Sequence, residues 1–227
     1  MVSDVFNCDC MDYMRTIPDK FFDLAIVDPP YGINAPKMVM GAGYSGGIYT
    51  SRKRLNGGGG KLKNRFLNNS DCSWDEEPPG EDYFKELFRI SKNQVIWGGN
   101  YFNLGPSRCI VVWDKVQPWE NFSQVELAWT SYDKPAKLYR LMNGGYNCEK
   151  KIHPTQKPVE LYKYLLSQFA EEGFKIFDSH LGSGSSRIAA WEYGFDFYGC
   201  EKNQNYFEKE EARFNKFKAQ GLFNFGG

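Results

Sequence analysis

The stretch that decides the fold reads Leu24-Ala25-Ile26-Val27-Asp28-Pro29-Pro30-Tyr31. Its four apolar residues predict a short buried strand. Asp28 follows at the carboxyl end of that strand, where open α/β sheets bind their ligands. The two prolines donate no N–H and keep the chain extended, so their carbonyl oxygens can accept hydrogen bonds. A carboxylate, a rigid carbonyl and the Tyr31 ring would suit a flat base held by its exocyclic amine; the alternative is a proline-rich turn without a ligand.

Length and composition indicate one folded domain of 227 residues, with 41% hydrophobic and 17% aromatic residues. No run of eighteen apolar residues occurs, and no signal peptide opens the chain, so we expect a soluble, cytoplasmic protein without a membrane partner. The six cysteines show no paired spacing, which predicts reduced thiols and no metal site. They are Cys8, Cys10, Cys72, Cys109, Cys148 and Cys200.

Charge is distributed unevenly along the chain, although its net value is zero. No acidic residue occurs between Asp28 and Asp71, whereas seven lysines and arginines do, together with nine glycines from position 32 to 70. This composition predicts a long flexible basic loop over residues 32–71, and such loops are uncommon unless they have a function. A linker with no role is the alternative.

The remaining pattern predicts an α/β protein. We expect a hairpin between strands 125–129 and 136–141, joined through 131–135. Thr155 is the expected N-cap of the next helix, with Pro158 in its first turn. The other predicted elements are a strand near 5–9 and a helix through Met14, then a helix at 82–92 and strands at 94–97 and 109–113, and, after residue 173, strands 174–178 and 196–200 and helices 185–193 and 204–218.

A second candidate site lies in the segment 178–184, Asp-Ser-His-Leu-Gly-Ser-Gly, between a predicted strand and a predicted helix. Its glycines allow a ligand to approach the backbone, and the helix N-terminus offers free N–H groups. Glu201 ends the next strand and could accept hydrogen bonds from ribose hydroxyls. Arg187 stands where a dinucleotide fingerprint would have its third glycine. The segment therefore predicts a nucleoside cofactor; a glycine-rich turn alone is the weaker reading.

Together these segments resemble the amino-group DNA methyltransferases, which use S-adenosylmethionine. Asp28-Pro29-Pro30-Tyr31 resembles their catalytic motif, and His153-Pro154-Thr155-Gln156-Lys157-Pro158 matches a second motif in full. The family pattern Asp-Pro-Phe-x-Gly-Ser-Gly-Thr-Thr is similar to residues 178–186, except that Ser179 and His180 replace Pro and Phe. The motif order resembles the β class. The resemblance thus implies a Rossmann-like methyltransferase fold of permuted motif order, a mostly parallel twisted sheet with helices on both faces.

The resemblance also assigns residues to roles. Catalysis would fall to Asp28, Pro29, Pro30 and Tyr31. Asp9 would contact the adenine amine of the cofactor, and Lys157 with its helix start would hold the methionine carboxylate. The full expected cofactor set is Asp9, Cys10, Asp28, His153, Thr155, Gln156, Lys157, Asp178, His180, Gly182, Ser183, Gly184, Ser185 and Glu201. The charge of the basic loop, rather than the resemblance, gives the expected DNA contacts, which are Arg52, Lys53, Arg54, Lys61 and Lys63.

The expected activity is methyl transfer to a flipped adenine, because relatives that begin this motif with Asp act on adenine. Methylation of the cytosine 4-amino group is the runner-up, followed by an RNA or protein amino methyltransferase and a silent DNA-binding module. Expected partners are double-stranded DNA, a second copy of the chain and a separate restriction endonuclease. Residues 1–31 and 72–113 would form a catalytic half, 114–152 DNA-contacting loops, and 153–227 the cofactor half.

Overall fold

A computed structural model describes residues 1–33, 73–116, 123–142 and 151–223. The basic loop falls almost wholly in the first gap, so the five predicted DNA contacts at positions 52, 53, 54, 61 and 63 lie outside the described residues. Within the described ranges, no helix is both long enough and apolar enough to cross a membrane.

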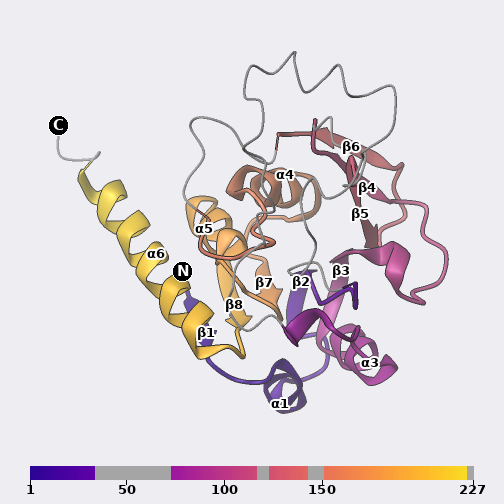
Figure 1. The fold of residues 1–227 in the computed structure, drawn as a ribbon, viewed down its shortest axis with the longest axis horizontal. Coiled ribbons are helices and arrows are strands. Elements are labelled where there is room, and N and C mark those ends of the chain that lie inside the picture. The colour runs from indigo at the N-terminus through magenta and orange to yellow at the C-terminus, as the bar shows by residue number, and fades with distance from the viewer. Residues whose placement is uncertain (34–72, 117–122, 143–150, 224–227) are drawn as a thin grey trace, which may run out of the picture.

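One sheet of eight strands organises the described chain (Figure 1). Its order is β1 (Ser3–Phe6), β8 (Asp196–Cys200), β7 (Lys175–Asp178), β2 (Phe22–Val27), β3 (Ser91–Trp97), β5 (Val125–Thr130), β4 (Val111–Asp114) and β6 (Lys137–Arg140). The first five strands run parallel, whereas β5 is antiparallel to both of its neighbours. The predicted α/β class with a mostly parallel sheet is confirmed.

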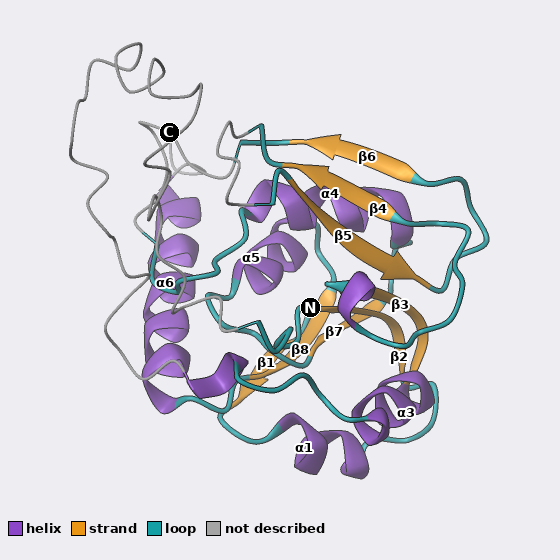
Figure 2. Cartoon of the chain, turned by 45° about the vertical axis from the view of Figure 1, so that its right-hand side comes forward, coloured by secondary structure: helices purple, strands orange, loops and turns teal. Residues whose placement is uncertain are grey.

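Helices cover both faces of this sheet (Figure 2). The short helix α1 (Cys10–Thr16) and α3 (Glu81–Ile90) lie on one face, and α4 (Val159–Phe169) and α5 (Ser185–Glu192) on the other. Neighbouring side chains of β2 alternate between these layers: Val27 packs with the first pair of helices and Ile26 with the second. Burial of each such side chain contributes roughly 1.5–3 kcal/mol. The helix α6 (Gln204–Phe223) lies beside α5, where its Phe214 contacts Trp191.

The predicted hairpin between residues 125–129 and 136–141 is wrong. The strand β4 lies between β5 and β6, pairing antiparallel with β5 and parallel with β6. Val111 and Trp113 of β4 are fully buried, whereas β6 is only half buried in an alternating pattern. A buried strand gains from a neighbour on each side, so β4 occupies the inner position and β6 the edge.

The predicted N-cap at Thr155 is also wrong. The helix α4 begins at Val159, and Pro158 occupies the cap position with an extended backbone. A proline disfavours helical dihedrals in the residue before it, so the helix cannot extend back through Lys157. Residues 153–156 instead form a separate turn, in which Gln156 N donates to His153 O at 3.2 Å. Asp9 is an N-cap rather than a strand end, because β1 stops at Phe6 and Asp9 accepts from Met11 N at 2.9 Å.

The strand order creates a switch point between β7 and β2. From β7 the chain passes through α5 to β8 on one side, and from β2 it passes through α3 to β3 on the other. Ligands of open α/β sheets bind in the crevice outside the carboxyl ends of the strands at such a point. Asp178 ends β7 and Asp28 follows β2, so two segments distant in sequence place carboxylates at one edge of the sheet.

Candidate active site

The Asp28 carboxylate accepts hydrogen bonds through both of its oxygens. Tyr31 Oη donates to Oδ1 at 2.6 Å, and Lys157 Nζ lies 2.5 Å from Oδ2. The side chain is 17% exposed, so most of it is removed from water. This burial raises the pKa of Asp28 above its ordinary value, while the charge of Lys157 opposes the rise. The predicted catalytic motif and the predicted motif 153–158 therefore meet at one carboxylate.

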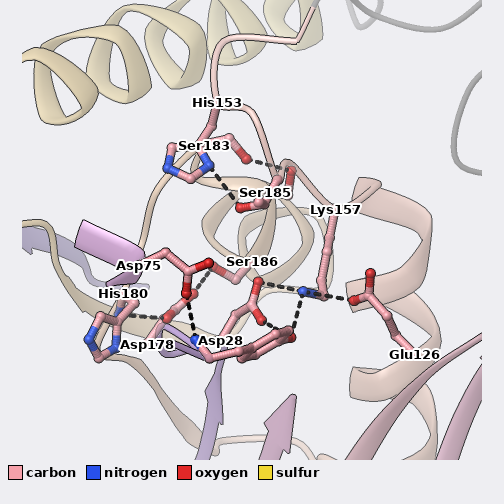
Figure 3. A network of polar contacts seen from close by, with 12 residues as sticks. Asp28, Asp75, Glu126, His153, Lys157, Asp178, His180, Ser183, Ser185 and Ser186 are labelled. Carbon is pink, nitrogen blue, oxygen red and sulfur yellow. Dashed lines mark hydrogen bonds and ion pairs between the residues drawn. The ribbon is translucent and has the colours of Figure 1, made fainter. Parts of the chain in front are cut away.

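Lys157 lies between two carboxylates (Figure 3). Its Nζ lies 3.1 Å from Glu126 Oε2, in addition to its contact with Asp28. It is also 3.2 Å from Tyr31 Oη. Although the burial of Lys157 alone would lower its pKa, the two carboxylates raise it. The ammonium thus donates hydrogen bonds to Asp28 and Tyr31 and forms an ion pair with Glu126, and a cofactor carboxylate would have to replace one of these partners. The predicted role of Lys157 in cofactor binding stays a prediction.

Glu126 takes part in the site because β5 is antiparallel. Trp97 pairs with Ala128, so the start of β5 lies at the same edge as the carboxyl ends of the parallel strands. Lys115, which follows β4, forms an ion pair with the other oxygen of Glu126. Burial would raise the pKa of Glu126, but Lys157 and Lys115 outweigh it and lower the pKa. The site therefore holds alternating negative and positive charges that balance one another.

Tyr31 is held in place from three sides. Its ring stacks on Tyr101, with 5.0 Å between centroids, and its backbone N–H donates to the buried Asp75 at 2.7 Å. Gly98 adopts φ +71° directly against the ring, where an added Cβ would lie 2.2 Å from a ring carbon. Only glycine allows this approach. Pro29 is buried and Pro30 partly buried.

The glycine-rich turn after β7 is closed by Glu201. The carboxylate accepts from Gly182 N and from Asn203 N, both at 2.8 Å. Gly182 and Gly184 both have positive φ, and a Cβ on Gly184 would lie 2.4 Å from Glu210. Burial raises the pKa of Glu201. The turn thus needs glycine at both positions, and it brings the Glu201 carboxylate against its own backbone.

Asp178 is almost completely buried at the end of β7. Ser186 Oγ donates to it at 2.5 Å and His180 N at 3.0 Å. Burial raises the pKa of Asp178 to about 7, and these hydrogen bonds only partly oppose the rise. Asp178 therefore ties the strand, the turn and the start of α5 together.

Ser179 and His180, the two departures from the family pattern, bond to each other and to α3. Ser179 Oγ lies 2.6 Å from Tyr83 Oη and 2.8 Å from His180 Nδ1. The His180 ring packs edge-on against Tyr83. Burial lowers the pKa of His180 to about 4, so the imidazole is neutral at pH 7. These contacts support a packing and hydrogen-bonding role for His180.

His153 braces the turn that precedes α4. Its ring lies edge-on to Tyr206 at 4.3 Å and tilted to Trp74 at 5.2 Å. Thr155 Oγ1 lies 3.2 Å from its Nδ1, and burial lowers the pKa of His153 to about 3. Gln156 closes the same turn by accepting from Ile152 N at 2.9 Å. This turn lies against the glycine-rich turn, because the Cα of Gly182 faces the His153 ring.

The remaining predicted cofactor residues lie on either side of the glycine-rich turn. Asp9 caps α1 and forms a surface ion pair with Lys202 at 2.9 Å. Burial raises the pKa of the neighbouring Cys10 thiol to about 12, so the thiol stays protonated. The Ser183 and Ser185 hydroxyls lie 3.2 Å apart beside the buried Arg213, which donates to Ser183 O and Ser185 Oγ.

Four residues of this site were missed in the sequence: Glu126, Lys115, Asp75 and Gly98. Glu126 belongs to the segment 125–129, which was predicted as one strand of a hairpin, so no role in the site was expected for it. Asp75 lies 44 residues from the backbone N–H that it binds. No local pattern identifies a contact of that kind.

The known proteins that are similar to this chain are DNA methyltransferases. A sequence model of the family described as DNA methylase, of the N6/N4 type, matches residues 110–212. The Type II methyltransferase M.HinfI of Haemophilus influenzae is 25% identical over 271 residues, covering 96% of this chain and 69% of that protein.

Solved structures show the same fold. The PvuII cytosine-N4-specific DNA methyltransferase has a TM-score of 0.60 at 13% identity, covering 94% of this chain and 86% of that one. The M1.HpyAVI–SAM complex has a TM-score of 0.56 at 16% identity, covering 95% and 100%. The fold is therefore that of methyltransferases, which confirms the predicted fold class. Within that class, the matched family model and the curated relative are both DNA methyltransferases, and the chain is similar to them, in agreement with the motifs.

Proposed function

We propose that this protein transfers a methyl group from S-adenosylmethionine to the 6-amino group of an adenine flipped out of double-stranded DNA. The observation that carries the proposal is the position of Asp28: its carboxylate lies at the switch point, next to the strand that leads into the glycine-rich turn. A solved relative of the same fold contains S-adenosylmethionine. Asp at the start of the catalytic motif favours adenine. Because PvuII methyltransferase acts on cytosine N4, the cytosine amine is the second candidate.

The residues around the glycine-rich turn fit this cofactor. Each oxygen of Glu201 accepts one backbone N–H and keeps a lone pair for a ribose hydroxyl. Within the described part of the chain, the buried indole N–H of Trp74 has no hydrogen-bond acceptor, so it could donate to a ligand oxygen. Asp9, Gly182 and Gly184 would add a carboxylate and backbone groups to the same cofactor site. When bound, the sulfonium of S-adenosylmethionine supplies the methyl group.

Asp28 and Pro29 would act on the target amine. The lone pair of an exocyclic amine is delocalised into the base, so the nitrogen is a poor nucleophile. If the Asp28 carboxylate and the Pro29 carbonyl each accept a hydrogen bond from one N–H of the amine, the nitrogen becomes pyramidal. Its lone pair is then available for the N–C bond. Fixed acceptors stabilise the positive charge that develops on nitrogen. A proton then leaves the nitrogen, to Asp28 or to water. Tyr31 would stack on the flipped base.

Methyl transfer to DNA, followed by mass analysis of the digested nucleosides, tests the substrate. Labelled 6-methyladenine is the expected product. A product of 4-methylcytosine would instead support the second candidate, and label found only on RNA or protein would refute the DNA assignment. Retention of DNA without any transferred label would identify a silent DNA-binding module.

Replacement of Glu201 with alanine is expected to weaken S-adenosylmethionine binding about tenfold or more, because ribose hydroxyls would lose a charged acceptor. Glu201→Gln keeps one acceptor oxygen and should fall between alanine and wild type. Isothermal titration measures the dissociation constants. Glu208→Ala, on the exposed face of α6, is the matched control. Equal affinities for the Glu201 and Glu208 variants would show that Glu201 only closes its turn.

DNA binding by the basic loop is argued from sequence alone. Each phosphate contact contributes roughly 0.9 to the slope of log affinity against log salt. Simultaneous replacement of Arg52, Lys53 and Arg54 with alanine is expected to flatten that slope by up to about 2.7, without changing cofactor affinity. Fluorescence anisotropy at several salt concentrations measures it.

The control for the loop variant removes three exposed basic side chains elsewhere, namely Lys85, Lys92 and Arg108. Both triple variants change the net charge equally, so only a specific contact separates them. The same slope for both would indicate that the loop residues are a solvated surface.

The homodimer and the separate restriction endonuclease stay predictions.

A further inference from the structure

The ammonium of Lys157 is enclosed by the site and shared between two carboxylates. Only 5% of its side chain is exposed. The Nζ atom lies 5.6 Å from the centroid of the Tyr31 ring and 5.4 Å from that of Trp97, so aromatic faces rather than water surround it. Because water is largely excluded there, the ammonium interacts strongly with the carboxylates that face it. Those anions are Asp28 at 2.5 Å and Glu126 at 3.1 Å.

This arrangement presents a problem for the proposed reaction. A carboxylate accepts about four hydrogen bonds, and Asp28 already accepts one at each oxygen. If Lys157 paired with Asp28 alone, its full charge would compete with the weakly polarised hydrogens of the target amine. It would also lie where positive charge develops on the amine nitrogen, which is unfavourable.

The negative charge of Glu126 reduces both effects, because it attracts the Lys157 ammonium away from Asp28 and offsets its positive charge. Figure 3 shows the Lys157 nitrogen between the Asp28 and Glu126 side chains. The second oxygen of Glu126 pairs with Lys115, which is only 14% exposed, so the glutamate is anchored from its far side. Four charges of alternating sign thus follow one another from β4 to the catalytic motif.

We infer that Glu126 is a positioning residue for the catalytic carboxylate: it shares the Lys157 ammonium and so leaves Asp28 able to accept the hydrogens of the target amine. This inference rests on the proposed function. In the proposed reaction Glu126 touches neither substrate nor cofactor; it acts through Lys157.

The sign of the effect follows from the groups that face Asp28. These are Lys157, Glu126 and Tyr31, with Tyr83, Tyr162 and Asp178 nearby. Burial raises the pKa of the three tyrosines well above the usual value, so they are neutral at pH 7. The negative charge of Glu126 raises the pKa of Asp28. If that charge is removed, the pKa of Asp28 falls and the carboxylate stays ionised to lower pH.

Glu126→Gln tests the inference through two readouts. We expect kcat to fall about tenfold or more with KM for DNA and cofactor changed little, because Lys157 then pairs with Asp28 alone. We also expect the titration of the Asp28 carboxyl carbon, followed by NMR, and the acid limb of the kcat–pH profile to move to lower pH. A loss of packing alone would lower activity without moving the titration in that direction.

Glu160→Gln is the matched control. Lys163 also lies between two carboxylates, Glu160 at 3.0 Å and Glu192 at 2.7 Å, but these three side chains are more exposed to water. The control variant should change neither readout. If Glu126→Gln lowers thermal stability, the double variant with Lys115→Met removes the ammonium that has lost its glutamate partner and is measured instead. An unshifted Asp28 titration or an unchanged kcat would overturn the inference. Absence of methyl transfer by the wild type would instead overturn the proposed function, and the NMR titration separates the two failures.

Discussion

Replacement of Asp28 with alanine is expected to lower the turnover of DNA methylation about a hundredfold or more, since one oriented acceptor at the developing charge is lost. Cofactor affinity should change little, because most of the proposed cofactor contacts lie around the glycine-rich turn. Lys157 keeps Glu126 as a partner in this variant, so the buried ammonium is not left unpaired. The measurements are single-turnover methyl transfer, isothermal titration with S-adenosylmethionine and thermal unfolding.

Asp23→Ala provides the control for this loss. Asp23 lies on the same strand, is 18% exposed against 17% for Asp28, and forms an ion pair with Lys92. It lies at the other end of β2, where it also accepts from Lys175 N at 2.9 Å. Its removal should lower stability but leave turnover unchanged. Activity of Asp28→Ala within about tenfold of the wild type would remove Asp28 from the reaction.

Gly98→Ala is the second change expected to have a large effect. The backbone at Gly98 is held on both sides, since Gly98 N donates to Leu127 O and Gly98 O accepts from Tyr101 N, both at 2.8 Å. The new Cβ would lie 2.2 Å from the Tyr31 ring, and the ring would have to move. Displacement of a positioning group by about 1 Å can cost roughly a hundredfold in rate. We expect that loss in kcat/KM for DNA.

Gly105→Ala separates displacement of the ring from backbone strain. Gly105 has φ +75°, close to the +71° of Gly98, but no atom lies within 4 Å of its added Cβ. Both variants therefore pay about 1–2 kcal/mol for a left-handed alanine. Only Gly98→Ala should lower methyl transfer as well as the melting temperature. Equal activities of the two variants would show that the position of Tyr31 does not limit the reaction.

Much of this site could be predicted from short stretches of sequence. Asp28 and Glu201 each stand at the end of an apolar strand, and Gly182 and Gly184 occupy the turn that follows another. A strand that ends in an acidic residue or a glycine turn is a local pattern. Parallel strands with connecting helices bring such ends to one edge of the sheet, so the sequence predicted both halves of the site.

Other features required the arrangement of the strands in space. Glu126 enters the site only because β5 is inserted antiparallel beside β3, whereas the local pattern of two strands and a short loop predicted a hairpin. The helix start at Val159, by contrast, has a local cause, namely the restriction that Pro158 imposes on the backbone of Lys157.

The sequence by itself thus determined the α/β class, the two motif-bearing turns and the carboxylate that we propose as catalytic, because each depends on residues that are neighbours in the chain. The tertiary structure decided which charges share Lys157, which residue anchors Tyr31 and which glycine its ring requires. Lys157 and Asp28 are 129 positions apart, and Tyr31 and Asp75 are 44 apart. Such contacts depend on strand order and register, which arise from burial of the whole sheet between its two helical layers.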